Sequence, residues 1–502
     1  MQNYAIKHWF TRQIPAGLGT VTLSLILTGC SGGSESTATM PATATTPPEA
    51  SISTLEAART ALGMEGLATL TYSGTAWRIR NSFRQTLTAS PPWPAHDEIS
   101  NYQYTIDLTT PTLRATGETF ASNLFLEPPV AGVYTQNVAP GQTAWGQQLE
   151  YWLTPWGFLQ GAETYGAEEA VQTINGMPMT TLSWHSPDTQ TSPSGLQYTV
   201  TGYLDDANLV RRVETWVEDA FMGDMHVLNT YDNYATVDSV LLPTTIEQQR
   251  GGGGIFGVSV TAASRNPANA QELLAIPAPP ARPGGAGGAP AAPAELSRQV
   301  ADGVYWITTG YTSLAVEFAD HIAVVEAGGS EAIGEQILAE AKRLFPTKPV
   351  RYLVNSHPHS DHTPGMLPFI REGVTIVTHP NNVDFLRMAL STPRTLLGQA
   401  TLDPQFMDTT DVTVLEDATR RLELHHIANL HTDGMYVAYL PNERILFEAD
   451  FTLPVAGANP NPFVINLAEY VDQAGLQFDQ YLAVHAAQTE QTMADLMATI
   501  GK

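Results

Sequence analysis

The stretch that decides the fold is Ser356-His357-Pro358-His359-Ser360-Asp361-His362-Thr363-Pro364-Gly365-Met366, which follows the apolar run 350–354. That run predicts a buried strand. His357 and His359, two residues apart on an extended loop, can point to one side and bind one metal ion. Asp361 and His362 then turn toward a second ion, and Gly365 lets the backbone pass closely into the next helix. The stretch predicts a metal site at a strand end. Solvated loop histidines or an incidental metal-scavenging patch are the alternatives.

The elements that precede this stretch indicate a layered α/β domain. Strand-like runs at 304–308, 314–318 and 322–326 lead into a helix. The apolar positions of that helix are Ile333, Ile337, Leu338, Ala341 and Leu344. Ser330 can cap its N-terminus. The alternation of strands and a helix is typical of an α/β fold.

The segment 357–362 resembles the signature of the metallo-β-lactamase fold superfamily. The resemblance covers residues 297–502 and implies a C-terminal αββα sandwich. Later segments follow the family's order: 429–434 resembles its next histidine loop, Asp450 its bridging aspartate, and His485 its last ligand. The implied arrangement places two metal ions side by side, with Asp450 and a water bridging them. One ion is held by His357, His359 and His431, and the other by Asp361, His362 and His485.

The resemblance implies a metal-dependent hydrolase with a small-molecule substrate. Two divalent ions that share a water lower its pKa to roughly neutral, so that hydroxide attacks an ester, thioester, lactone or phosphodiester. Asp361 is expected to be the catalytic carboxylate that orients the hydroxide and takes up its proton. Imidazole and carboxylate ligands suit two Zn²⁺, with Fe or Mn as the other options. Asp450 stands where antibiotic-destroying members typically carry Cys or Ser, so β-lactamase activity is not expected.

Two other functions are compatible with these residues. Persulfide dioxygenases share the fold and the signature but use one iron and O₂, so an oxidoreductase is one alternative. A non-catalytic envelope lipoprotein that binds an apolar ligand is the other. Among the remaining residues, His379 could support the metal ligands or pack in a loop, and His425 and His426 fall on a predicted strand with no ligand role. Whether Glu326 hydrogen-bonds a ligand imidazole is left open by the sequence.

Residues 51–275 predict a separate, mostly antiparallel β domain, for which the sequence assigns no role. One short helix is expected near 53–62. The runs 198–204 and 209–217, separated by a polar turn, predict a hairpin. A Pro/Gly/Ala-rich linker at 276–296 joins this domain to the C-terminal one.

The N-terminus predicts export and a lipid anchor. Residues 1–29 combine a weakly basic leader with a short apolar run and resemble a lipoprotein signal peptide that ends before Cys30, the only cysteine. Residues 30–50 then form a flexible tether with lipidated Cys30, which predicts an outer-membrane lipoprotein facing the periplasm. The formal net charge of −26 repels phosphate backbones, so nucleic acid is excluded as a partner.

Overall fold

The computed structural model describes residues 53–79, 88–93, 97–121, 130–174, 176–277, 295–429, 431–454, 459–485 and 491–502. The predicted signal peptide and tether, and most of the predicted linker, lie outside these residues. No helix in the described ranges is long and apolar enough to cross a membrane.

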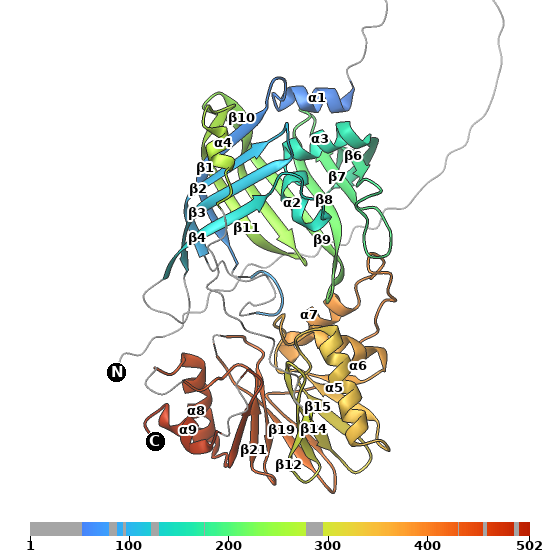
Figure 1. The fold of residues 1–502 in the computed structure, drawn as a ribbon, viewed down its shortest axis with the longest axis vertical. Helices are drawn as coiled ribbons and strands as arrows, with labels where there is room; N and C mark the ends of the chain where they lie inside the picture. The colour runs from blue at the N-terminus through green and yellow to red at the C-terminus, as the bar shows by residue number, and fades with distance from the viewer. Residues whose placement is uncertain are drawn as a thin grey trace, which may run out of the picture. The chain divides into compact units, whose positions relative to one another are not determined.

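The N-terminal part is built on one large antiparallel sheet, as predicted (Figure 1). Its strand order within the described residues is β4-β3-β2-β1-β11-β10-β9-β8-β7-β6-β5. The strands are β1 (Thr69–Arg78), β2 (Asp97–Asp107), β3 (Thr112–Ala121), β4 (Val130–Val138), β5 (Glu168–Ile174), β6 (Met177–His185), β7 (Thr199–Leu204), β8 (Val210–Asp219), β9 (Gly223–Val237), β10 (Val240–Arg250) and β11 (Gly253–Arg265). The predicted hairpin is confirmed as β7 and β8.

The helices of this part were only partly predicted. The expected first helix is α1 (Thr54–Ala61), and a short α4 (Ala270–Leu274) follows the sheet. Helix α4 was not predicted, and two longer helices, α2 (Trp145–Trp152) and α3 (Pro155–Tyr165), were also missed. Their aromatic-rich sequences suggest strands, but Thr154 accepts a hydrogen bond from the Gly157 amide and so caps α3. Phe158 packs directly on β7, where a Cβ on Gly202 would lie 2.2 Å from its ring.

Two sheets form the centre of the C-terminal part. The first has the order β12-β13-β14-β15-β16-β17 and the second β18-β19-β20-β21-β22. The first comprises β12 (Ser297–Ala301), β13 (Val304–Thr308), β14 (Thr312–Glu317), β15 (Ile322–Val325), β16 (Val350–Val354) and β17 (Thr375–Val377). The second comprises β18 (Val412–Glu416), β19 (Arg421–His426), β20 (Tyr436–Leu440), β21 (Ile445–Glu448) and β22 (Gln480–Ala483). Strands β15, β20 and β21 are buried along their whole length, as expected for strands covered on both faces.

Helices lie on the outer sides of the two sheets (Figure 1). Helices α5 (Glu331–Leu344), α6 (Leu367–Arg371) and α7 (Pro380–Leu390) flank the first sheet, and α8 (Pro462–Ala474) and α9 (Met493–Ala498) flank the second. A short 3-10 turn, Pro364–Met366, precedes α6. Ser330 caps α5 by accepting from the Ile333 amide, as predicted. The predicted fold class, an α/β sandwich preceded by an antiparallel β domain, is confirmed.

Candidate metal centre

The structure gathers all seven predicted ligands into two adjacent groups of side chains. In each group, the candidate ligand atoms lie within 4.8 Å of one another. The first group is His357, His359, His431 and Asp450, and the second is Asp361, His362 and His485.

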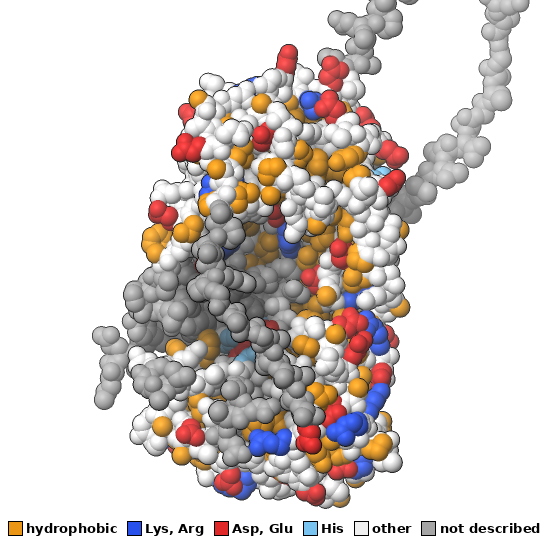
Figure 2. Space-filling model, in the orientation of Figure 1, with side chains coloured by type: hydrophobic (Ala, Val, Ile, Leu, Met, Phe, Trp, Pro, Cys, Tyr) orange, Lys and Arg blue, Asp and Glu red, His pale blue; other side chains and the backbone are white. Residues whose placement is uncertain are grey.

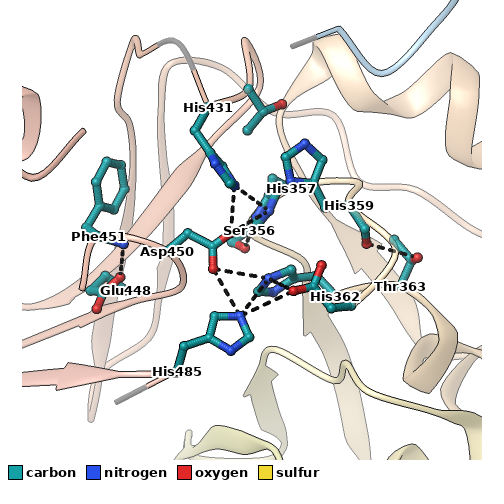
Figure 3. A network of polar contacts seen from close by, with 12 residues as sticks. Ser356, His357, His359, His362, Thr363, His431, Glu448, Asp450, Phe451 and His485 are labelled. Carbon is teal, nitrogen blue, oxygen red and sulfur yellow. Dashed lines mark hydrogen bonds and ion pairs between the residues drawn. The ribbon is translucent and has the colours of Figure 1, made fainter. Parts of the chain in front are cut away.

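The Asp450 carboxylate lies between the two groups and directs one oxygen to each (Figure 3). Its Oδ2 lies 2.6 Å from His431 Nε2 and 3.1 Å from His357 Nε2. Its Oδ1 lies 3.0 Å from His485 Nε2 and 3.4 Å from His362 Nε2. A carboxylate in this position can bind two cations at once.

The spacing and chemistry of these atoms fit metal ions. Nε2 of His431 lies 3.3 Å from Nε2 of His357, and Nε2 of His485 lies 3.1 Å from Nε2 of His362. Ligand atoms at bond lengths of about 2.0–2.1 Å around a tetrahedral ion are separated by roughly 3.3–3.4 Å. Imidazole and carboxylate donors without thiolate suit Zn²⁺ and related divalent ions.

Three strand ends and several glycines position these ligands. The 357–362 loop follows β16, Asp450 follows β21, and His485 follows β22. A Cβ on Gly365 would lie 2.4 Å from the Ala327 carbonyl oxygen, and one on Gly328 would lie 2.1 Å from that of Asp361. The loop therefore packs against the end of β15 at a distance that only glycine allows.

Glu326 contacts the His362 imidazole on the side that faces away from the other candidate ligands. This answers the question, left open by the sequence, of whether Glu326 hydrogen-bonds a ligand imidazole. Its Oε2 lies 2.7 Å from His362 Nδ1, and its Oε1 accepts from the Ser356 amide at 2.6 Å. The Tyr311 hydroxyl lies 2.5 Å from the same Oε2 and 2.6 Å from His362 Nδ1. With its Nδ1 engaged by this pair, His362 presents Nε2 to the centre, the usual arrangement behind a ligating imidazole. Glu326 adopts a left-handed backbone, φ 68°.

Other buried contacts fix the remaining loops. Ser356 Oγ lies 2.8 Å from His357 Nδ1. The Asn429 side chain accepts from the His431 amide at 2.7 Å, which holds that histidine's loop. Glu448 Oε2 accepts from the Phe451 amide at 2.5 Å and so closes the turn that carries Asp450. Nothing in the sequence pointed to Tyr311 or Glu448, because neither lies in a motif.

Burial and close charges shift the pKa values of these groups in opposite directions. Burial, together with neighbouring His362 and His359, lowers the pKa of His357. Burial also opposes charge on His362, but Asp450 and Glu326 outweigh it and raise the pKa of that imidazole. Burial works against charge on Asp450 as well, yet His362 and His357 outweigh it, and the pKa of Asp450 is lowered. Burial raises the pKa of Glu448 to about 8, which keeps this carboxyl mostly protonated at neutral pH.

We expect metal uptake by the metal-free protein to weaken as pH falls. His362 holds its proton above the usual range of a histidine, so an incoming cation must displace that proton, and affinity should rise with pH through the raised pKa. One displaced proton changes the apparent Kd for Zn²⁺ by up to about tenfold per pH unit. Chelator competition between about pH 6 and pH 8 measures this. An apparent Kd that does not change over this range would contradict the expectation.

A third cluster, His379, Asp411 and His426, has suitable atoms but not suitable geometry. The two imidazole rings are stacked, with centroids 4.0 Å apart and planes inclined by 22°. One ion cannot lie near the plane of both rings when they are stacked in this way. His379 instead caps α7 by accepting from the Asn381 amide at 3.3 Å. Neighbouring His425 is buried and bonded to Tyr470 and Glu423, as expected of a residue without a ligand role.

The fold and the clustered ligands define the C-terminal part as a metal-binding α/β sandwich. Residues 309–484 match the family model of the metallo-beta-lactamase superfamily, and this domain belongs to that superfamily. The chain is similar to the solved structure of a metallo-beta-lactamase from Pontibacter korlensis, at 19% identity over 41% of this chain and 97% of that one, with a TM-score of 0.33. It is also similar to one from Erythrobacter litoralis, at 19% identity over 41% and 93%, with a TM-score of 0.32. No curated protein sequence matches the chain.

Proposed function

We propose that the C-terminal domain is a hydrolase that uses two divalent cations, with zinc as the favoured metal, to cleave an ester-like bond. The position of Asp450 carries this proposal, because one carboxylate oxygen faces each histidine group. The cations would be held by His357, His359 and His431 on one side and by Asp361, His362 and His485 on the other, with Asp450 between them. Such a pair supplies a hydroxide nucleophile near neutral pH and polarises the substrate oxygen.

The protein's own groups provide positioning and proton transfer. Asp361 is 44% exposed, more than the other carboxylates of the centre, so its carboxylate can meet both substrate and solvent. Burial opposes its charge, but His362 outweighs burial and lowers the pKa of Asp361. The ionised carboxylate can therefore orient the attacking oxygen and accept its proton. Glu326 and Tyr311 keep His362 in one orientation throughout.

The proposal is tested by metal analysis joined to a hydrolysis panel. The purified chain should contain about two zinc per molecule. After zinc reconstitution it should cleave at least one class among carboxyl esters, lactones, thioesters and phosphodiesters, and a chelator should abolish this cleavage.

Two other results would overturn the proposal. One iron per chain with O₂-dependent persulfide oxidation would show the oxygenase instead. Metal-loaded protein that cleaves no member of the panel would favour a non-catalytic binding protein.

A further inference from the structure

We infer that the substrate is an uncharged carboxylic ester, thioester or lactone with an apolar acyl group. This inference rests on the proposed hydrolase function and narrows it. It excludes substrates that the site would have to bind through a negatively charged group of the substrate, such as a carboxylate or a phosphodiester.

The first observation is that the ligand loops carry no basic residue. No Lys or Arg occurs in the spans 352–370, 422–443 and 445–501, and these spans contain all seven candidate ligands. The gaps in the described residues at 430, 455–458 and 486–490 fall within the same spans, so they add no cation either.

The second observation is that the basic side chains elsewhere in residues 297–502 are already paired. Most form ion pairs with surface or partly buried carboxylates. These pairs are Lys342–Glu372, Arg343–Glu340, Lys348–Glu317, Arg351–Asp320, Arg371–Glu331, Arg420–Glu443, Arg421–Glu416, Arg444–Asp479 and Lys502–Asp472. The other three contact rings or an amide: Arg298 with Trp306, Arg387 with Phe406 and Arg394 with Gln399. On the lower part of the molecule in Figure 2, the visible blue Lys and Arg patches lie below and to the right of the pale blue histidine atoms and do not touch them.

The third observation concerns the charge of the centre itself. Two divalent cations would bring four positive charges. The carboxylates of Asp450, Asp361 and Glu326 offset three of these, and a hydroxide nucleophile offsets the fourth. The loaded centre therefore has little net charge with which to hold an anionic substrate, and the chain's net charge of −26 repels one.

The fourth observation is that aromatic side chains adjoin the ligands. The Phe463 ring, at the start of α8, lies 5.0 Å from the His431 ring between centroids. The Tyr311 ring lies 6.0 Å from that of His485. The described chain after Asp450, Phe451-Thr452-Leu453-Pro454, is apolar apart from one threonine. These surroundings favour an apolar acyl group.

Anionic substrate groups are normally recognised by Arg or Lys, and a buried anion without such a partner is unfavourable. Arg80, Arg84 and Arg282, with Lys7 and Arg12, lie outside the described residues. The described basic residues of the N-terminal part are engaged with acidic side chains or backbone carbonyls: Arg59, Arg78, Arg114, Arg211, Arg212, Arg250 and Arg265.

The test compares matched esters on the zinc-loaded full chain. Para-nitrophenyl butyrate is uncharged, whereas mono-para-nitrophenyl succinate has the same leaving group and an anionic acyl group of similar length. After each rate is divided by that of hydroxide-catalysed hydrolysis, kcat/KM should favour the butyrate by about tenfold or more. Butyrate cleavage should be unchanged between low salt and about 0.5 M NaCl, whereas succinate cleavage should rise as salt screens repulsion.

A thermal shift with the uncleaved amides N-butyl butyramide and N-butyl succinamate measures binding without turnover. Only the neutral amide, N-butyl butyramide, should raise the Tm of the protein.

Each result decides something different. Equal normalised rates, or a preference for the succinate or for bis(para-nitrophenyl) phosphate, would overturn the inference while leaving the hydrolase function intact. No cleavage of any of these by metal-loaded protein would instead count against the hydrolase function. A positive charge added beside the ligands provides a second check. Phe463→Lys should shift the preference toward the succinate. The control variant Val412→Lys, at an exposed position of β18, should not change the preference. If Phe463→Lys does not fold, the ratio of butyrate to succinate cleavage by the wild-type protein, and the dependence of that ratio on salt, still test the inference.

Discussion

His359→Ala is expected to lose bound metal and hydrolytic activity together, with kcat/KM falling by roughly 1000-fold or more. His359 is buried, and its ring lies 4.5 Å from the rings of both His357 and His431, so its removal opens the first group of ligands. Metal content by elemental analysis and ester hydrolysis on the same sample measure the two losses.

His185→Ala is the matched control for this variant. His185 is exposed at the end of β6, and its Nδ1 lies 3.0 Å from Thr199 Oγ1 in the N-terminal sheet. It should keep metal and activity, and both variants should retain the circular dichroism of the parent. If His359→Ala kept full metal and full hydrolysis, the assignment of ligands would be wrong.

Glu326→Gln is expected to lower metal affinity by about 10–100-fold. The substitution keeps the size of the side chain but removes the charge that faces His362 Nδ1 at 2.7 Å, which makes that imidazole a weaker donor. Chelator competition at fixed pH gives the change in Kd. Activity at saturating zinc should recover in part, because the ligands themselves remain.

The control uses another glutamate, partly buried rather than fully buried, that also contacts a histidine. Glu423 lies 2.9 Å from His425 Nε2, on β19 and outside the two ligand groups. Glu423→Gln should leave zinc affinity unchanged. Equal affinities for the parent, Glu326→Gln and Glu423→Gln would show that Glu326 does not act on the metal centre.

The sequence indicates a shared site most directly where the candidate ligands are local. His357, His359, Asp361 and His362 lie within six residues, so their spacing alone indicates a shared site. His431, Asp450 and His485 are distant in sequence, and nothing in their local context brings them together. Their placement depended on the resemblance to a family, and the structure brings them to the same place.

The parts that escaped prediction depend on tertiary contacts. Tyr311 supports His362 only because β14 begins beside the 357–362 loop in the folded domain. Helix α3 consists largely of aromatic and small residues with weak helical periodicity, and α2 is only eight residues long, too short for its pattern to stand out. Burial of Trp145, Trp152 and Trp156 stabilises these helices, and burial cannot be seen before the sheet is formed.

The left-handed backbone of Glu326 means that the fold keeps a side chain at this position against a conformational cost. A residue with a Cβ in this region costs about 1–2 kcal/mol, which glycine would largely avoid. Glycine would also lose the buried contacts of the carboxylate with the Ser356 amide, the Tyr311 hydroxyl and His362, which together stabilise the fold by more than this backbone cost. Glu326→Gly should therefore lower the melting temperature rather than raise it. Protein engineers who raise the melting temperature of this protein should therefore hold position 326 fixed, because the same carboxylate stabilises the 357–362 loop and orients His362.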